Sequence, residues 1–270
     1  MEDKEKLRGI SKEIRQEILE MIYRTKSPHI GCSFSMVELL VTLYFKILSV
    51  NSANPADPQR DRFLLSKGHG CPTLYAVLAK KGLIEKSLLE NFAKDGGILE
   101  QHPSYNPKLG VEITSGSLGH GLSIGAGMAL AGKYDKAPWR VFVFLGDGEL
   151  NEGTCWEAIM FSKQHNLDNL IAIVDHNKLQ AMAKSSEIIN LEPLKQKWET
   201  FGWSVKEVDG HNLEEILTAL AKIPFEAGKP SCLIAHTIKG KGVSFMENEP
   251  CWHDKFPGQE EYQKAKEELK

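Results

Sequence analysis

Two short polar segments in this sequence carry side chains that are suited to holding a metal ion. The first is Gly146-Asp147-Gly148-Glu149 and the second is Asp175-His176-Asn177-Lys178-Leu179. The Asp147 carboxylate and the Asn177 amide offer hard oxygen donors. With a backbone carbonyl they could bind Mg²⁺, which otherwise prefers phosphate oxygens and water. The two segments therefore suggest a magnesium site with a phosphate-bearing ligand.

The glycines of the first segment support the same chemistry. Gly146 and Gly148 leave backbone N–H groups free to approach a diphosphate, and a helix that follows would offer its positive end. Asp-Gly and Asn are also common turn residues, so either segment alone would indicate an ordinary turn. Together, separated by a length that suits one crossover helix, they favour a ligand site.

Both segments directly follow apolar runs that are predicted to be strands. The runs are Arg140–Leu145 and Leu170–Val174, and neither alternates with polar residues. Strands of this kind are buried on both faces, as in a parallel sheet, and the stretch 154–165 is predicted to be the helix between them. The polar segments would then meet at the carboxyl ends of neighbouring parallel strands, where open α/β sheets bind ligands.

The remaining chain alternates in the same way and predicts a doubly wound, mostly parallel α/β sheet with helices on both faces. We expect one domain over 1–270, with a C-terminal loop and helix from about 238, and a long irregular segment over 95–121. Asn212, with Glu215 three residues later, resembles a capping box. Further helices are expected over 6–25, about 35–48, 72–81, 122–133 and 213–222, and further strands over 62–65, 203–208 and 231–236.

Composition excludes several classes of protein. The chain has 270 residues, 41% of them apolar, and a net charge of −3, which argues against a general nucleic-acid or membrane-surface binder. The most apolar stretch, 36–48, contains Glu38 and Lys46, so it does not predict a membrane span. The five cysteines form no C-x-x-C pair and are expected to be reduced thiols. The charged N-terminus has no apolar signal core, so we expect a cytoplasmic protein.

Several motifs in order resemble the thiamine-diphosphate enzymes, and within them the transketolases. Besides the G-D-G segment and Asn177, they are Ser66–Gly70 (SKGHG), Gly110–Gly121 (GVEITSGSLGHG) and Ile238–Val243 (IKGKGV). The resemblance extends from Ser27 to about Pro257. It implies the diphosphate-binding part of a transketolase, which moves a two-carbon ketol unit from a ketose to an aldose, with or without phosphate groups on these sugars, and which uses thiamine diphosphate and Mg²⁺.

The resemblance also assigns roles to residues near the G-D-G segment. Asp147, Asn177 and the carbonyl of Leu179 would bind Mg²⁺. Gly148 and the backbone of Glu149 would contact the diphosphate.

The remaining assignments concern the cofactor's rings and the sugar. Gly116 and Leu118 would line the ring system of the cofactor. Four histidines match active-site histidines that contact the diphosphate and the sugar hydroxyls and help to move protons: His29, His69, His102 and His253. Four other histidines are expected to be structural or local: His165, His176, His211 and His236.

Departures from the family pattern concern the sugar more than the cofactor. Pro28 and Ile30 flank His29 where the family usually has glycine and proline. His120 replaces a common glutamine, and Asp254 follows His253 where the family often has glycine. The sequence therefore leaves the donor and acceptor sugars open, and with them the choice between the pentose phosphate pathway and a specialised one.

The resemblance implies a partner chain. Family enzymes hold the cofactor between this domain and a pyrimidine-type domain, which supplies an activating glutamate and would begin near the end of this sequence. Glu149 lies at the diphosphate segment, and Glu152 and Glu157 match acidic residues of the subunit contact, so none of the three replaces it. We expect a separate C-terminal subunit in an α2β2 assembly, docked around 116–121 and the helix after Gly153.

Alternative functions remain open on the sequence alone. Gly119-x-Gly121-x-x-x-Gly125 loosely resembles a dinucleotide loop, but no buried strand precedes it. Within the thiamine-diphosphate enzymes, the alternatives are a deoxyxylulose-phosphate synthase-like enzyme and a decarboxylase-type subunit. A cofactor-free regulatory subunit is an alternative of a different class.

Overall fold

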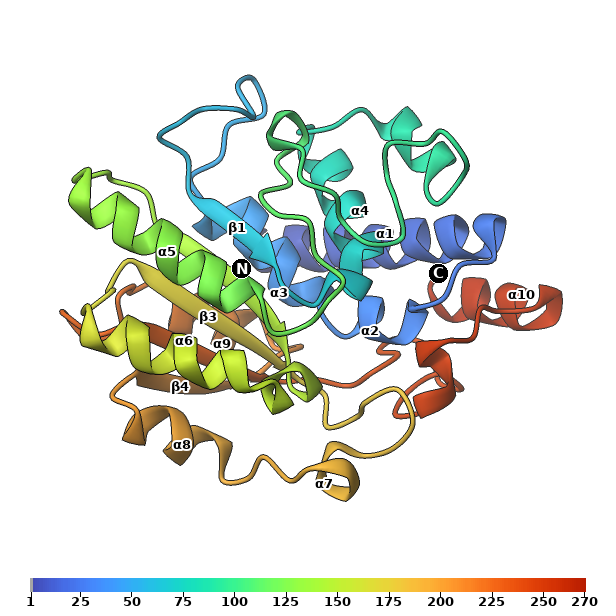
Figure 1. Cartoon of the computed structure of the whole chain (residues 1–270). Coiled ribbons are helices and arrows are strands. Elements are labelled where there is room, and N and C mark those ends of the chain that lie inside the picture. The colour runs from blue at the N-terminus through green and yellow to red at the C-terminus, as the bar shows by residue number, and fades with distance from the viewer. Residues whose placement is uncertain (1) are drawn as a thin grey trace.

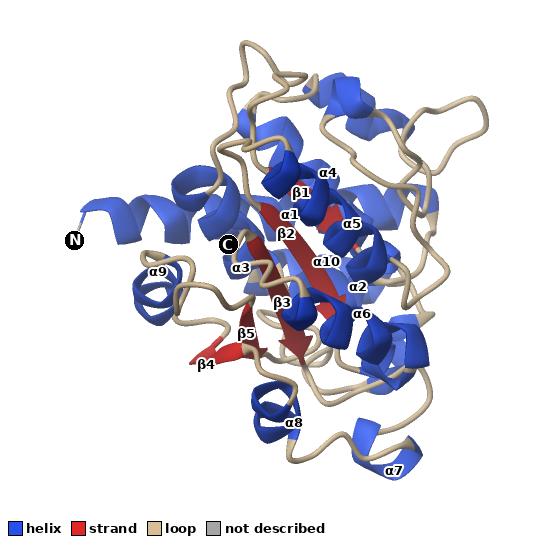
Figure 2. Ribbon diagram, turned by 60° about the vertical axis from the view of Figure 1, so that its left-hand side comes forward, coloured by secondary structure: helices blue, strands red, loops and turns tan. Residues whose placement is uncertain are grey.

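Five parallel strands form the central sheet of the protein, in the order β1-β2-β3-β5-β4 (Figures 1 and 2). This computed structural model describes residues 2–270. The five predicted strands are all present, and the two polar segments follow neighbouring strands, as the sequence predicted. The strands are β1 (Arg62–Leu65), β2 (Val141–Gly146), β3 (Leu170–His176), β4 (Ser204–Asp209) and β5 (Ser231–His236).

Both faces of the sheet are covered by helices. Alternate residues of each central strand point to opposite faces: Phe142 and Phe144 pack with α1, α3 and α4, whereas Val141 and Val143 pack with α5 and α6. This explains why β2 and β3 lack polar alternation, because neither face meets water. These helices are α1 (Glu2–Thr25), α3 (Val37–Thr42), α4 (Cys71–Lys81), α5 (Gly121–Tyr134) and α6 (Gly153–Gln164).

The helix predicted over about 35–48 is present close to those bounds, but a short helix before it was not predicted. The helical region begins earlier, at α2 (Ile30–Phe34), breaks, resumes as α3 and ends in a π-helical turn, Leu43–Ile47. The break falls at Ser35, whose Oγ lies 2.6 Å from Asp175 Oδ2 on β3. A contact with a distant strand end therefore sets this boundary, and local sequence periodicity does not reveal it.

Smaller elements complete the fold, and two of them, α7 and α8, were not predicted. Trp198 of α8 is fully buried against the second face of the sheet. Asn212 caps α9 as expected, because its side chain accepts the N–H groups of Glu214 and Glu215. The remaining α-helices are α7 (Ser185–Ile188), α8 (Leu194–Thr200), α9 (Leu213–Leu220) and α10 (Gln259–Glu268). Short 3-10 turns lie at Gly68–Gly70, Lys86–Asn91, Pro107–Leu109, Gly148–Asn151 and Pro250–His253.

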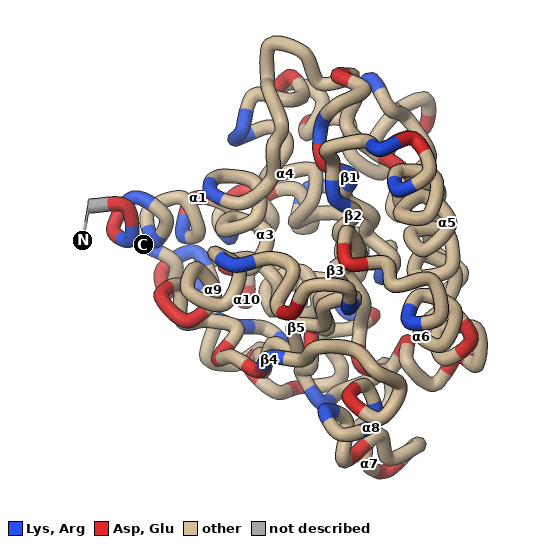
Figure 3. The backbone as a smooth tube through the Cα atoms, turned by 90° about the vertical axis from the view of Figure 1, so that its left-hand side faces the viewer, with Lys and Arg blue, Asp and Glu red and all other residues tan. Residues whose placement is uncertain are grey.

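Charges of both signs are interspersed over the outer elements (Figure 3). This agrees with the balanced composition. Within residues 2–270, no helix combines the length and apolar character that crossing a membrane requires.

Close packing of α5 on the sheet gives a stability prediction. A Cβ at Gly125 would lie 2.5 Å from Val143 Cγ2 on β2, whereas a Cβ at Gly127, on the same helix, would meet nothing within 4 Å. We expect Gly125→Ala to lower the free energy of unfolding by about 1–3 kcal/mol through overpacking. The matched variant Gly127→Ala should raise it by about 0.5–1 kcal/mol, since alanine favours helix. Urea denaturation measures both, and equal effects would contradict this packing.

Candidate active site

A cavity of about 300 Å³ lies at the carboxyl ends of β1, β2 and β3. The register of the sheet pairs Gly146 with Asp175, so the segments that follow β2 and β3 lie side by side. Every residue that the sequence analysis placed in the site lines this one cavity. The lining residues are His29, Cys32, Lys67, His69, His102, Gly116, Leu118, Gly146–Glu149, Asn177, Leu179–Ala181, Lys239 and His253.

The Asp147 side chain is buried at the end of β2. Its Oδ1 accepts the N–H of Gly148 at 2.8 Å, and its Oδ2 accepts the N–H of Lys178 at 2.7 Å. Burial, and then the negative charge of Asp175, raise the pKa of the Asp147 carboxyl to about 6. A cation beside it would favour the ionised form.

The amide oxygen of Asn177 accepts the N–H of Leu179 at 3.0 Å and keeps a second lone pair for a metal.

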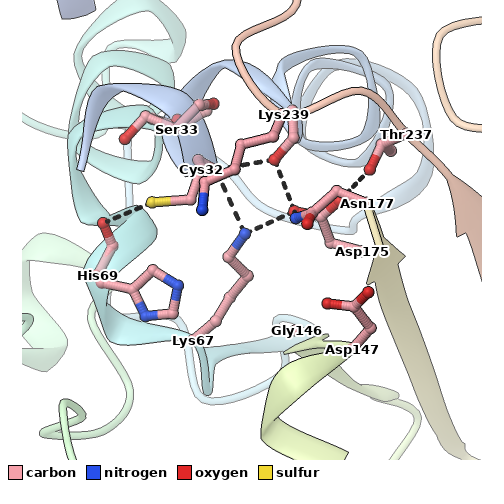
Figure 4. Close-up of polar contacts among 12 residues, drawn as sticks. Cys32, Ser33, Lys67, His69, Gly146, Asp147, Asp175, Asn177, Thr237 and Lys239 are labelled. Atoms are coloured by element: carbon pink, nitrogen blue, oxygen red, sulfur yellow. Dashed lines mark hydrogen bonds and ion pairs between the residues drawn. The ribbon is translucent and has the colours of Figure 1, made fainter. Parts of the chain in front are cut away.

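A buried ion pair, which the sequence did not predict, lies next to Asp147 and Asn177. Lys67 Nζ is 2.5 Å from Asp175 Oδ2, and the two side chains are 1% and 0% exposed (Figure 4). Thr237 at the end of β5 donates to the other Asp175 oxygen. Lys67 also donates to the Cys32 carbonyl, at 3.3 Å. Both charged residues belong to segments that the sequence singled out, but nothing in the sequence indicates that they pair.

Glu149 is buried, and its carboxylate is committed to the protein. It accepts hydrogen bonds from Ser66 and from the N–H groups of Gly119 and Gly146. Burial raises the pKa of this carboxyl. The side chain therefore connects the Gly- and Ser-rich segment to the G-D-G turn. Because the Glu149 carbonyl accepts the N–H of Glu152, a contact with a cofactor would have to come from the Glu149 N–H. The N–H of Gly119 is engaged here, which argues against the dinucleotide-loop alternative.

The four predicted histidines form one cluster. Ring centroids lie 5.6 Å apart for His29 and His69, 5.5 Å for His29 and His102, and 5.2 Å for His29 and His253. Burial, and then the charges of His253 and His102, lower the pKa of His29 to about 4. Burial, and then Lys239, lower the pKa of His253 to about 4. These two imidazoles are therefore neutral near pH 7, and each can donate one hydrogen bond and accept another.

The His29 backbone is held in an unusual conformation. Its φ is +78°, in the left-handed region that non-glycine residues rarely adopt. Its N–H donates to the His253 carbonyl at 2.8 Å. The Pro28-His29-Ile30 sequence thus keeps the histidine in the cluster although its neighbours differ from the family pattern.

Lys239 is a second cation in the cavity that the site prediction omitted. Its Nζ donates to the Gln180 carbonyl at 3.0 Å and lies 3.3 Å from His253 Nδ1. Burial lowers the pKa of the Lys239 ammonium. Lys239 belongs to the quoted IKGKGV motif, which was the available signal. Gln180 Nε2 is buried and, within residues 2–270, meets no hydrogen-bond acceptor.

The two glutamates expected at the subunit contact lie outside the cavity. Glu152 and Glu157, at and after the start of α6, are exposed. Three apolar side chains on α5 and α6 are also exposed: Ile124 at 41%, Met160 at 50% and Phe161 at 40%.

The parallel sheet and the groups at its strand ends are those of an α/β protein suited to a diphosphate and a divalent cation. Comparison of the sequence places it more narrowly, because residues 8–270 match the family described as transketolase, thiamine diphosphate binding domain. The chain belongs to the transketolase family and corresponds to its N-terminal, cofactor-binding part.

Individual relatives agree with this assignment. The chain is 42% identical to one of the subunits of an apulose-4-phosphate transketolase from Phocaeicola vulgatus, over 96% of this chain and 92% of that one. It is 43% identical to a 6-deoxy-6-sulfo-D-fructose transketolase subunit of a Clostridium species, over 95% and 93%. The solved transketolase of Campylobacter jejuni superposes with a TM-score of 0.91 at 30% identity, over 97% of this chain but 42% of that one.

Thiamine diphosphate and Mg²⁺ are the cofactors of this family, and the cavity fits them. Carboxylate, amide and carbonyl oxygens are the donors that Mg²⁺ prefers. The Lys239 ammonium suits an anionic diphosphate, as does the Gln180 Nε2, which meets no acceptor within residues 2–270. A side chain at Gly148 would collide with Gln180, 2.9 Å from its Cβ position, so the backbone stays accessible.

The metal donors give a direct prediction. In the chain assembled with its partner subunit, we expect Asp147→Asn to weaken Mg²⁺-dependent thiamine diphosphate binding by about 100-fold or more, since even residues behind the metal ligands can cost 10–100-fold. Isothermal titration calorimetry measures the affinity. The matched control is Asp254→Asn, because Asp254 lies with His29 and His253 in a second group of possible metal ligands. If Asp254→Asn loses binding and Asp147→Asn does not, the metal site must be assigned to His29, His253 and Asp254 instead.

Proposed function

We propose that this chain and a separate partner subunit together transfer a two-carbon ketol unit from a ketose to an aldose. One observation carries the proposal: four clustered histidines, His29, His69, His102 and His253, share a cavity with diphosphate- and metal-binding groups. When bound, thiamine diphosphate supplies a carbon nucleophile and an electron sink. The chain itself must hold that cofactor, orient the sugar and move protons.

The strand-end residues hold the cofactor in this proposal. Asp147, Asn177 and the carbonyl of Leu179 bind Mg²⁺. Gly148 and the backbone N–H of Glu149 approach the diphosphate, as their place beside Asp147 in the cavity allows. Gly116 and Leu118 line the ring system. Lys239, which the sequence-based site prediction omitted, adds a cation toward the diphosphate.

The histidines orient the sugar and move protons. The Lys239 ammonium can only donate, so His253 Nδ1 accepts and the imidazole proton lies on Nε2. His253 can therefore donate from Nε2 to a sugar oxygen. His69 lies deeper, and burial holds the pKa of its imidazole well below the usual value, so it too stays neutral. We assign His29 and His102 to the sugar hydroxyls, and His69 and His253 to both cofactor and sugar.

The partner subunit supplies what this chain lacks for cofactor activation. Glu149 is the buried glutamate of the cavity, and its carboxylate already accepts three hydrogen bonds. We assign the activating glutamate to the pyrimidine-type domain of the partner, in an α2β2 assembly. Residues 116–121 and α6 form the docking face in this proposal, which the exposed Met160 and Phe161 of α6 support.

The sugars are inferred from the named relatives. Their names specify a phosphate-bearing and a sulfonate-bearing sugar. We therefore propose a ketose donor with an anionic group. The pentose phosphate pathway and a cytoplasmic location stay predictions.

Proton exchange at the cofactor's C2 tests the division of labour between the subunits. We expect the purified chain to leave deuterium exchange at C2 of thiamine diphosphate at the rate of free cofactor, because it lacks the glutamate. Adding the partner should accelerate exchange, and the partner alone should not. Quenched-flow NMR measures the rates. Accelerated exchange and full ketol transfer by the lone chain would contradict the split arrangement.

A further inference from the structure

Three hydrogen bonds from distant parts of the chain hold the backbone of the loop that carries Lys239. The N–H of Ile238 donates to His211 Nε2 at 2.9 Å. The N–H of Gly240 donates to the Gly31 carbonyl at 2.9 Å. Arg15 Nε donates to the Lys241 carbonyl, also at 2.9 Å. The backbone on both sides of Lys239 is thus fixed, and its side chain lies in the active-site cavity.

Two of these hydrogen bonds, those made by Arg15 and His211, involve residues that both contact Glu38. Arg15 donates to both Glu38 oxygens, at 2.6 and 2.7 Å, and His211 Nδ1 lies 2.9 Å from Glu38 Oε2. Burial alone would raise the pKa of the Glu38 carboxyl, but the Arg15 charge and the His211 hydrogen bond lower it to about 2. The expectation that His211 is only local was therefore incomplete, because it contacts residues far away in the chain.

The contacts of His211 fix its tautomer. Nε2 accepts the Ile238 N–H, so the ring proton lies on Nδ1 and is donated to Glu38. The imidazole acts as a neutral bridge from the Arg15–Glu38 ion pair to the loop. It faces a separate cavity of about 460 Å³, formed with α1 and the start of α9, and does not line the active-site cavity.

We propose that His211 is a positioning residue that aims Lys239 at the cofactor diphosphate. The proposal rests on the role given to Lys239 under the proposed function. Without the bridge, the Ile238 N–H loses its acceptor, and the loop can shift the Lys239 side chain away from Gln180 and His253. His211 itself lies outside the active-site cavity, so any effect on the cofactor must pass through the loop.

Two substitutions separate the two hydrogen bonds of His211. In His211→Asn the shorter amide can still donate to Glu38 but does not reach Ile238. In His211→Gln the longer side chain can reach Ile238 and accept its N–H. Both variants stay polar, so neither places an apolar group in the charged network.

The experiment is a double-mutant cycle in the assembled enzyme, with thiamine diphosphate and Mg²⁺ affinity measured by calorimetry. We expect Lys239→Met and His211→Asn each to weaken binding by about tenfold, the equivalent of one lost hydrogen bond of about 1.4 kcal/mol. His211→Gln should stay within about threefold of the parent. Adding His211→Asn to Lys239→Met should cause no further loss of cofactor affinity.

Hydrogen exchange of the lone chain gives a second readout. The amides of 238–242 should exchange faster in His211→Asn and at the parental rate in His211→Gln. An equal affinity loss from His211→Asn with and without Lys239→Met would overturn the positioning role. If Lys239→Met binds cofactor as tightly as the parent, the role of Lys239 in the proposed function fails instead, and the positioning role fails with it.

Discussion

The buried ion pair between Lys67 and Asp175 is the constraint on which the site depends. Bringing two charges out of water is costly, and it is tolerated only with good geometry and further hydrogen bonds. Here Ser35 and Thr237 supply those bonds, so the pair joins β1 and β3 to the α2–α3 break and to the end of β5. Four segments far apart in the sequence are thereby held at one edge of the sheet.

Two groups of residues lie on either side of this ion pair in the active site. On one side, Asp147 and Asn177, the proposed metal ligands, lie next to Asp175, whose negative charge is already paired with Lys67. On the other side, Glu149 fastens the Gly- and Ser-rich segment to β2, and the histidines of the cluster close the cavity. Charges that are paired within the protein form the base of the cavity. The groups that we propose for the cofactor and the metal, Lys239, Asp147 and Asn177, line the same cavity.

The sequence predicted the strands correctly, and it predicted which residues lie at their carboxyl ends. The five strands could be predicted from their apolar runs. That Asp147 and Asn177 share one cavity could be predicted because neighbouring parallel strands end at the same edge of a sheet. Pairings between distant segments could not. Lys67 with Asp175, Lys239 with His253 and Glu38 with His211 depend on tertiary packing, which has no local periodicity. The break at Ser35 and the buried Trp198 of α8 were missed for the same reason.

Crystals of the assembled enzyme grown with thiamine diphosphate and Mn²⁺ in place of Mg²⁺ offer the most direct test of this account. Anomalous scattering locates the manganese without assumptions about its ligands. We expect a peak in contact with the Asp147 carboxylate, the Asn177 amide oxygen and the Leu179 carbonyl. A peak at His29, His253 and Asp254 instead, with none at the ends of β2 and β3, would contradict it.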